Sequence, residues 1–197
     1  YNGNGSLLST TSPEGITTTH TYDVMNRETG SVETSEDASL SISASTIYGY
    51  DTNVSFPSEM GLLPISICFK ETKTTGSIVS ETWMDGKGQT VKEAEGGVTS
   101  YFRYDQSGNQ VMEVQSGGGD QRISLNLYDQ NGNNFATIQN PEITQSGDFT
   151  ANGTNSILTK TVYYPDDNVK AEVTEGVVTG YTYDSDNRIT SVSLDAT

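Results

Sequence analysis

The chain has 197 residues, and 10 Lys and Arg against 26 Asp and Glu give it a formal net charge of -16. Only 32% of its residues are hydrophobic, which is low for a domain with one thick, enclosed core. So negative a surface would repel phosphate backbones and anionic lipids, which excludes nucleic-acid binding and membrane-surface docking as expected functions.

Two further classes of protein are excluded by what the sequence lacks. No apolar run approaches the roughly 18 residues that cross a bilayer, so membrane insertion is not expected. The one cysteine, Cys68, allows neither an internal disulfide nor a cysteine metal cluster, and we expect a buried, inert thiol. Frequent Tyr, Val, Ile and Thr at alternating positions indicate ordered strands instead of the disorder that low hydrophobicity and high charge would suggest.

One short pattern, Tyr-Asp-x-x-Gly followed by a β-prone run, recurs from end to end of the chain. Clear copies start at the anchors Tyr104, Tyr128 and Tyr183. Weaker copies start at Tyr1, Tyr22, Tyr50, Met84 and Tyr164. We therefore expect residues 1–197 to form a single array of eight repeats, in which insertions lengthen three units, and to be an internal piece of a larger protein.

The residues after each anchor predict a hairpin turn. A short acidic or amide side chain usually follows directly: Asn2, Asp23, Asp51, Asp85, Asp105, Asp129 and Asp184. Three positions later stands Gly or Asn in every unit but the one with Val54: Gly5, Asn26, Gly88, Gly108, Gly132, Asn168 and Asn187. An Asp that bonds its own following backbone, then a residue that accepts positive φ, is typical of a type I turn closed by a β-bulge.

A second set of turns lies between the anchors, at 12–15, 95–97, 116–120 and 175–176. Two alternating kinds of turn predict an all-β fold, an antiparallel meander of hairpins in a single curved, spiralling sheet. The longer segments 30–46, 57–77 and 141–156 are expected to be loops or extra hairpins, and no segment has a helical period.

Side chains alternate between the two faces of a strand, so the residue two positions before each anchor lies on the same face as the anchor. Those residues are mostly aromatic or apolar: His20, Tyr48, Thr82, Phe102, Asn126, Val162 and Tyr181. We therefore expect one tyrosine-rich, apolar face and one polar face. Tyr48, Phe102 and Tyr181 are the candidate ligand face, because aromatic rings stack on sugars as well as on one another.

Catalysis, metal binding and cofactor binding are not expected. A Ser-His-Asp triad would need His20, which stands in the same repeat position as Tyr48 and Tyr181. The carboxylate pairs Asp166-Asp167 and Asp184-Asp186 fall in repeated turns. The oxygen-rich turn 129–133 lacks the glycine position and the final Glu of a calcium loop, and no phosphate-binding or dinucleotide motif is present.

These motifs resemble the YD-repeat, or RHS-repeat, family, with its pattern Gly-x-x-x-x-Tyr-x-Tyr-Asp-x-x-Gly-Arg-Leu. The matching stretches are 13–23, 97–109 and 176–189. Arg follows the turn residue only at Arg27 and Arg188, Met84 replaces a tyrosine and Pro165 displaces an Asp. The Asp-Pro-x-Gly-Leu boundary that the family associates with self-cleavage is absent from this sequence.

The resemblance implies a strip of a β-sheet shell. In RHS proteins and in the cages of insecticidal toxin complexes such shells enclose a toxic C-terminal polypeptide, and in teneurins a similar shell is part of an adhesion ectodomain. We expect a bacterial, secreted or cell-surface parent protein, with flanking repeats and an encapsulated C-terminal polypeptide as partners. Free sheet edges predict self-association of the isolated piece. The alternative is a surface module for adhesion or carbohydrate binding that uses the tyrosine-rich face.

Overall fold

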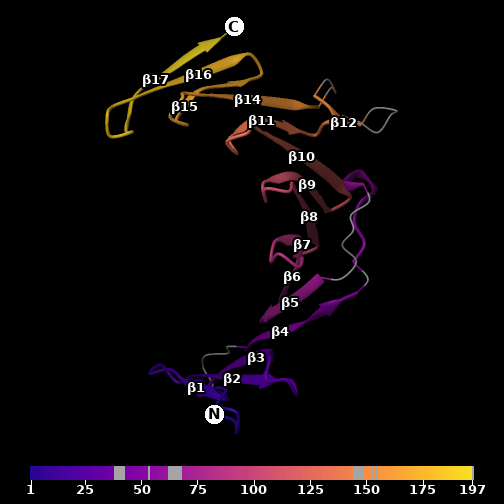
Figure 1. Ribbon diagram of the computed structural model, residues 1–197. Coiled ribbons are helices and arrows are strands. Elements are labelled where there is room, and N and C mark those ends of the chain that lie inside the picture. The colour runs from indigo at the N-terminus through magenta and orange to yellow at the C-terminus, as the bar shows by residue number, and fades with distance from the viewer. Residues whose placement is uncertain are drawn as a thin grey trace. The chain divides into compact units, whose positions relative to one another are not determined.

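The computed structural model describes residues 1–37, 43–52, 54–61, 68–143, 149–151, 153 and 155–196. The chain forms two compact units, Tyr1–Tyr101 and Phe102–Thr197, and their boundary falls within one strand. Both units are built of β-strands (Figure 1). In the described ranges the helical content is the single 3-10 turn η1, Ser58–Met60, and no helix there is long and apolar enough to cross a membrane.

From β1 to β7, each strand of the first unit pairs antiparallel with the strand that follows it in the chain. The strands are β1 (Ser9–Thr11), β2 (Ile16–Tyr22), β3 (Glu28–Ser35), β4 (Ser43–Asp51), β5 (Cys68–Thr75), β6 (Ile78–Met84), β7 (Thr90–Glu95) and β8 (Val98–Tyr104).

The second unit continues the same order, with one interruption. Its strands are β9 (Gln110–Gly117), β10 (Asp120–Tyr128), β11 (Asn134–Gln139), β14 (Ile157–Tyr163), β15 (Val169–Thr174), β16 (Val177–Tyr183) and β17 (Ile189–Ala196). Between β11 and β14, β12 (Glu142–Ile143) pairs with β13 (Phe149–Thr150) as a separate ladder. The predicted all-β antiparallel meander is confirmed.

The segments predicted as loops or extra hairpins contain more strand than expected. Most of 30–46 belongs to β3 and β4, and β5 occupies the last part of 57–77. In 141–156 the short ladder of β12 and β13 is an extra hairpin. Residues 38–42, 62–67, 144–148, 152 and 154 of these segments lie outside the described residues.

Three of the turns between anchors are two-residue hairpins in which both residues have positive φ. These pairs are Gly96 with Gly97 (φ 59° and 82°), Gly118 with Gly119 (φ 63° and 92°), and Glu175 with Gly176 (φ 50° and 80°). Two successive left-handed residues define a type I′ turn, whose twist matches that of the flanking strands. The glycines of the sequence therefore fall where the hairpins need them.

The core does not lie on the face that the sequence analysis expected. Residues directly opposite each other on paired strands share a face. In the second unit one such row is Met112, Leu125, Ile138 and Leu158 on β9, β10, β11 and β14. The next row, on the opposite face and the face of Tyr128, is Glu113, Ser124, Gln139 and Ile157.

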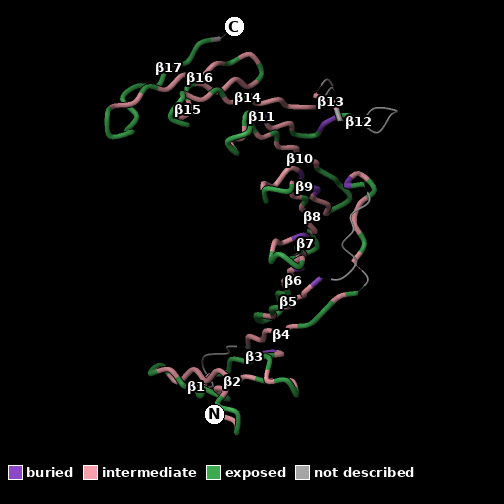
Figure 2. The backbone as a smooth tube through the Cα atoms, in the orientation of Figure 1, coloured by how far each residue is buried: buried purple, intermediate pink, exposed green. Residues whose placement is uncertain are grey.

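Burial follows the aliphatic row. Met112 and Val114 are 3% and 0% exposed, and both lie on the face opposite Tyr128. The expectation of an apolar tyrosine face and a polar second face is thus wrong for β9 to β11, because the intervening positions carry the buried aliphatic residues. Figure 2 shows how few residues of either unit are buried.

In the first unit the core surrounds Trp83, which is 3% exposed. Cys68 and Val91 are buried beside it, and Val54 and Phe56, from the segment between β4 and β5, pack against this cluster. The Cys68 thiol is buried, as expected, and burial raises its pKa. Lys70 and Lys92 stand directly opposite Trp83 on the two neighbouring strands, with their Nζ atoms 4.6 and 4.2 Å from the ring centroid. The cation–π contacts fix Trp83 from both sides.

This two-faced arrangement predicts unequal effects of truncation on the two faces. Met112→Ala should lower the free energy of unfolding by about 2–5 kcal/mol, because it removes a buried side chain and leaves a cavity. Gln139→Ala, at an exposed position on the tyrosine face of β11, should change it by no more than about 0.5 kcal/mol. Urea unfolding followed by circular dichroism measures both, and equal losses would contradict the assignment of the core.

Candidate functional site

The repeated anchor turn is the most regular site in the molecule, and Asp129 shows its geometry. The Asp129 N–H donates to the Asn133 carbonyl (2.9 Å), and the Gly132 N–H donates to the Asp129 carbonyl (3.1 Å). Asp129 Oδ1 accepts from the N–H groups of Asn131 and Asn133, both at 2.9 Å. Gly132 has φ 86°. One carboxylate oxygen thus satisfies two backbone donors that the strand ladder leaves unpaired.

The same geometry recurs along both units. Oδ1 of the residue after the anchor accepts backbone N–H groups two and four positions on at Asn2, Asp23, Asp85 and Asp184. The left-handed residue has φ between 60° and 93° at Gly5, Asn26, Gly88, Gly108, Gly132 and Asn187. Pairing registers shift by one residue just before the turns that follow Tyr22, Met84, Tyr128, Tyr163 and Tyr183. Each shift is the β-bulge that such a turn requires.

The turn that the sequence analysis assigned to the anchor Tyr164 starts one residue earlier than expected. The anchor is Tyr163, the last residue of β14, and the Tyr164 N–H donates to the Asn168 carbonyl at 2.8 Å. The left-handed residue is Asp167 (φ 64°), where Asn168 was expected. Proline is the reason: Pro165 has no N–H and cannot make the bond that opens the turn, so Tyr164 makes it.

Asp51 also departs from the predicted turn role. It ends β4 opposite Cys68, so the chain makes a long connection here instead of a tight hairpin. Its Oδ2 accepts the indole N–H of Trp83 at 2.8 Å. The position three residues on is Val54, a β-branched residue that does not favour the left-handed conformation.

Three anchor tyrosines tie their strand to the one before it. The hydroxyls of Tyr22, Tyr128 and Tyr163 donate to the carbonyls of Leu7 (2.8 Å), Gln110 (3.1 Å) and Asn134 (2.7 Å), respectively. Each acceptor lies near the start of the neighbouring strand, six residues after the preceding anchor. The tyrosine therefore satisfies a carbonyl at the point where the bulge interrupts regular pairing. The repeat pattern predicted the positions of Tyr22 and Tyr128 but placed the third anchor at Tyr164, and it predicted none of these bonds.

Consecutive turns are also joined by side-chain amides. The Nδ2 groups of Asn2, Asn133 and Asn168 donate to Oδ1 of Asn26 (3.0 Å), Asp167 (2.7 Å) and Asn187 (3.1 Å). In all three pairs the acceptor is the left-handed residue of the next turn. Asn and Asp at this position therefore both adopt the required φ and bind the preceding turn.

Three of the turn carboxylates, those of Asp23, Asp105 and Asp184, have lowered pKa values. The backbone N–H of Arg27 is the largest cause for Asp23, and that of Arg188 is the largest for Asp184. Hydrogen bonds from the Asn109 side chain and then its backbone lower the pKa of Asp105. In Asp23 and Asp184 the arginine side chain also donates Nε to Oδ2, at 2.7 and 2.8 Å. The charged form of each turn is thus the stable one.

The three residues of the candidate ligand face lie on three separate strands. Tyr48, Phe102 and Tyr181 lie on β4, β8 and β16, strands that neither pair with one another nor share a partner in the described pairings. The Tyr181 hydroxyl donates to Glu172 Oε2 at 2.8 Å, and that bond raises its pKa. Burial, followed by the charges of Glu71 and Glu28, raises the pKa of Tyr48.

Tyr48 belongs instead to an aromatic cluster with Phe69 and Tyr50, which the pattern of anchors did not indicate as a group. The ring centroids of Tyr48 and Tyr50 both lie 5.9 Å from that of Phe69, the first stacked and the second edge-on. Tyr50 is 67% exposed. Tyr104 and Tyr183 occupy the anchor position at the ends of β8 and β16, and the Tyr183 ring packs edge-on against Tyr164.

The residues considered for catalysis or metal binding have local partners. His20 Nδ1 lies 3.0 Å from Glu28 Oε1 on the neighbouring strand. Asp184 and Asp186 both pair with Arg188 within one turn. Among the residues that the structure describes, no group of three or more His, Cys, Asp or Glu side chains is placed to hold a metal ion.

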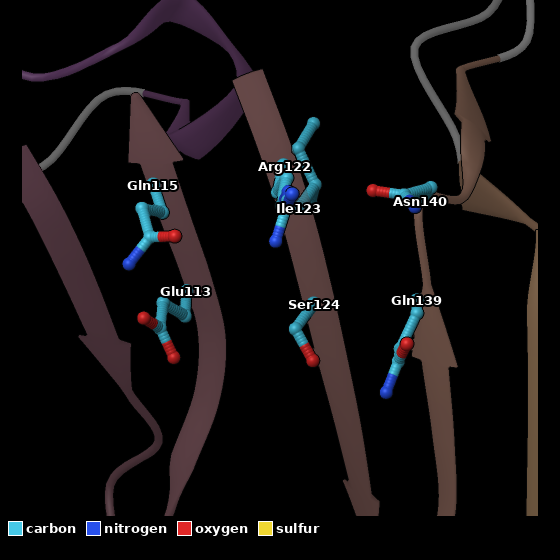
Figure 3. Close-up of a pocket in the computed structure, with 7 residues that line it drawn as sticks. All are labelled: Glu113, Gln115, Arg122, Ile123, Ser124, Gln139 and Asn140. Atoms are coloured by element: carbon cyan, nitrogen blue, oxygen red, sulfur yellow. The ribbon is translucent and has the colours of Figure 1, made fainter. Parts of the chain in front are cut away.

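A polar pocket lies on β9, β10 and β11 of the second unit (Figure 3). Its volume is about 370 Å³, and it is lined by Glu113, Gln115, Arg122, Ile123, Ser124, Gln139 and Asn140. Ser124 stands directly opposite both Glu113 and Gln139, so a short side chain lies between two long ones. The hollow follows from this difference in length.

Residues 1–38 match the family model described as RHS Repeat, and the YD- or RHS-repeat assignment made from the sequence is confirmed by that match. The two turns of this stretch, at Asn2 and Asp23, have the geometry that recurs along the rest of the chain. No curated protein matches the sequence.

Three crystal structures resemble the chain in backbone course. TcdB2-TccC3-Cdc42 has a TM-score of 0.48 and 11% sequence identity, and the match covers 98% of this chain and 11% of that chain. TcdB2-TccC3-TEV has a TM-score of 0.35 and 9% identity, with 91% of this chain and 14% of that chain covered. TcdB2-TccC3 without its hypervariable C-terminal region has a TM-score of 0.32 and 9% identity, with 93% of this chain and 14% of that chain covered. The chain thus spans 11–14% of the length of these structures.

Removing one tyrosine hydroxyl tests the hydrogen bond between the anchor tyrosine and a backbone carbonyl of the preceding strand. Tyr128→Phe should lower the free energy of unfolding by about 0.5–1.5 kcal/mol, because the Gln110 carbonyl loses a donor. Tyr50→Phe is the matched control: the ring is largely exposed, and a change within about 0.5 kcal/mol is expected. Urea titrations of the two variants measure the difference, and an unaltered Tyr128→Phe protein would show that the hydroxyl contributes nothing.

The lowered pKa values predict acid sensitivity. A carboxylate whose pKa is lower in the folded state stabilises the fold above its unfolded pKa of about 3.9, and this stabilisation is lost as the pH falls through the folded pKa. Asn at positions 23, 105 and 184 keeps the acceptor oxygen, as Asn2 does, but cannot titrate. The triple variant Asp23→Asn, Asp105→Asn, Asp184→Asn should therefore lose less stability than the native chain between pH 6 and pH 2.

Thermal unfolding across this pH range measures that difference. Asp120→Asn, which changes a carboxylate outside the anchor turns, is the control and should follow the native chain. Parallel pH profiles for the native chain and the triple variant would contradict the assignment.

Proposed function

We propose that this chain is a non-catalytic wall segment of an RHS-repeat shell that encloses a polypeptide cargo of the same parent protein. The RHS-repeat match of residues 1–38 supports the structural role. The resemblance of the repeat motifs to a family whose shells enclose a polypeptide supports encapsulation. The parent protein is proposed to be bacterial and to act outside the cell or at its surface, as proteins with such repeats do.

The observation that carries the proposal is the way each repeat depends on its neighbour. Tyrosine hydroxyls and turn amides make their bonds to the adjoining repeat, as in Tyr128 to Gln110 and Asn168 to Asn187. A unit so built cannot satisfy its own polar groups or bury its own aliphatic face alone. Such units favour an extended wall over a self-contained binding domain.

The strands at the two ends of the order support flanking repeats as partners. In the described pairings β1 pairs only with β2, and β17 pairs only with β16. On β17, Val192 and Leu194 are 57% and 72% exposed. A free edge with exposed apolar side chains fits a further strand, supplied by the next repeat or, in the isolated chain, by a second copy.

A structural role also accounts for the residues that could have served chemistry. The carboxylates of the anchor turns accept backbone N–H groups, and His20 pairs with Glu28 across two strands. Each group therefore has a local task in the fold, which supports a module without catalytic activity.

A surface module for adhesion is the second candidate. The aromatic cluster of Tyr48, Phe69 and Tyr50 favours it, because Tyr50 presents most of its surface to solvent beside two further rings. Exposed aromatic rings stack on sugars and pack against protein partners. In this case the cluster would bind an extracellular ligand, and no cargo would be enclosed.

Limited proteolysis of the parent polypeptide separates the two candidates. Fragments are mapped by mass spectrometry and compared with a digest of the isolated C-terminal segment under the same conditions. A shell predicts that the segment survives in the parent protein while the isolated segment is digested. Rapid loss of the segment while the repeats persist would overturn encapsulation and favour the surface module.

A further inference from the structure

Asn-Gly pairs occupy two equivalent turn positions, one in each unit. The sequence has this dipeptide at 2–3, 4–5, 131–132 and 152–153, of which residue 152 lies outside the described residues. Asn4 and Asn131 each stand directly before the left-handed glycine of an anchor turn, Gly5 (φ 82°) and Gly132 (φ 86°). Their backbone N–H groups donate to Oδ1 of the first turn residue, at 3.0 and 2.9 Å. The two asparagines therefore have the same place in the same kind of turn.

The carboxamides of Asn4 and Asn131 have no task in the fold. Both residues are exposed, and among the described residues neither carboxamide makes a hydrogen bond. The following glycines leave their nitrogens uncovered, since glycine has no side chain. A Cβ atom at Gly5 would meet nothing within 4 Å, and one at Gly132 would meet Asn109 Oδ1 at 4.0 Å. Each carboxamide can therefore turn its carbonyl carbon toward the nitrogen of the next residue.

Asn2 also precedes a glycine, but its carboxamide is held on both sides. Its Oδ1 accepts the N–H groups of Asn4 (3.0 Å) and Ser6 (2.8 Å), and its Nδ2 donates to Asn26 Oδ1 (3.0 Å). Turning this carboxamide toward Gly3 breaks three hydrogen bonds, one of which joins two consecutive turns. The fold thus protects one Asn-Gly pair and leaves two pairs of the same covalent structure unprotected.

We propose that Asn4 and Asn131 are sites of spontaneous deamidation and that the fold protects Asn2 from it. At Asn131, the amide nitrogen of Gly132 gives its proton to water or hydroxide and attacks Cγ of the carboxamide. The new N–C bond closes a five-membered succinimide ring, the Cγ–Nδ2 bond breaks, and the nitrogen leaves as ammonia after taking up a proton. Water then opens the ring: addition at Cγ gives aspartate, and addition at the backbone carbonyl carbon gives isoaspartate. Water is the co-reactant, and nothing is oxidised or reduced.

One backbone hydrogen bond opposes the attack in both turns. The N–H groups of Gly5 and Gly132 donate to the carbonyls of Asn2 and Asp129, at 3.0 and 3.1 Å. This bond lies at an exposed turn, where local opening costs little free energy. The fold therefore slows the reaction at Asn131 relative to the unfolded chain without preventing it.

Isoaspartate at position 131 alters the turn between β10 and β11. It adds one methylene group to the main chain between residues 131 and 132, and it places a second carboxylate beside that of Asp129. Asn133 closes this turn through its backbone and donates Nδ2 to Asp167 Oδ1 at 2.7 Å. The longer main chain displaces Asn133, so the modification weakens the link to the next turn. This inference rests on turn geometry and does not depend on the encapsulation proposal.

Incubation of the full chain at mildly alkaline pH and physiological temperature tests the proposal. Samples taken over several weeks are digested at acidic pH, and fragment-ion mass spectrometry locates the replacement of the amide NH2 by OH at each asparagine. Asn4 and Asn131 should convert at least tenfold faster than Asn2. In urea, where the fold no longer distinguishes the pairs, all three should convert at similar rates. Equal rates at Asn2 and Asn131 in the folded chain would overturn the proposal, as would conversion of Asn131 in urea alone.

Two variants of the turn supply matched controls. Gly132→Asn keeps a residue that adopts the left-handed conformation, as Asn187 does, but covers the nitrogen with a side chain. Conversion at Asn131 should then fall at least tenfold. Asn131→Gln keeps the carboxamide and should stay unconverted, because its longer side chain would have to close a six-membered ring. Asn4 should convert at the native rate in both variants, and an unchanged rate at Asn131 in Gly132→Asn would overturn the proposal.

Discussion

The fold depends on one backbone conformation that the chain must adopt once in each anchor turn. A type I turn continues into the next strand only if the residue that closes it is left-handed, and residues other than Gly, Asn and Asp adopt that conformation at a higher cost. The sequence places Gly at 88 and 132 and Asn at 26 and 187, all with positive φ. The carboxylate or amide at the first turn position then holds the loop by accepting two backbone N–H groups. Strand pairing, register and bulge all follow from this corner.

The bulge that the corner creates explains why the repeat carries tyrosine. The extra residue interrupts the ladder and leaves carbonyls of the neighbouring strand without a backbone donor. Tyrosine reaches past the end of the ladder and donates its hydroxyl to such a carbonyl, as Tyr22, Tyr128 and Tyr163 do. Phenylalanine would keep the packing but lose this bond. The polar bonds therefore run from repeat to repeat, which lets a chain with few buried residues remain ordered.

Turn chemistry was the part of the structure most readable from sequence. The meander and the alternation of two turn types follow from short-range preferences, and the Gly pairs at 96–97 and 118–119 mark type I′ hairpins directly. The face of the core could not be read in the same way. The tyrosines suggested an apolar face, but the hydroxyls of Tyr22, Tyr128 and Tyr163 donate to backbone carbonyls. The aliphatic row from Met112 to Leu158 lies on the opposite face from Tyr128. Pairing register between strands, which sets these rows, is a long-range property that the anchors alone do not fix.

Two deviations from the repeat pattern show how the array of strands accommodates changes in sequence. Pro165 cannot donate, so the turn moves back by one residue and Asp167 takes the left-handed position, where it still accepts the amide of Asn133. After Tyr50 the chain contains an insertion, and Asp51 ends β4 opposite Cys68 instead of opening a tight turn. Its carboxylate instead holds the indole of Trp83, which lies between Lys70 and Lys92 and beneath Val54 and Phe56 from that same insertion. Val54 and Phe56 of the inserted segment thus supply apolar cover for Trp83 and its neighbours. An insertion in a repeat wall can therefore add a local core without disturbing the register of the strands on either side of it.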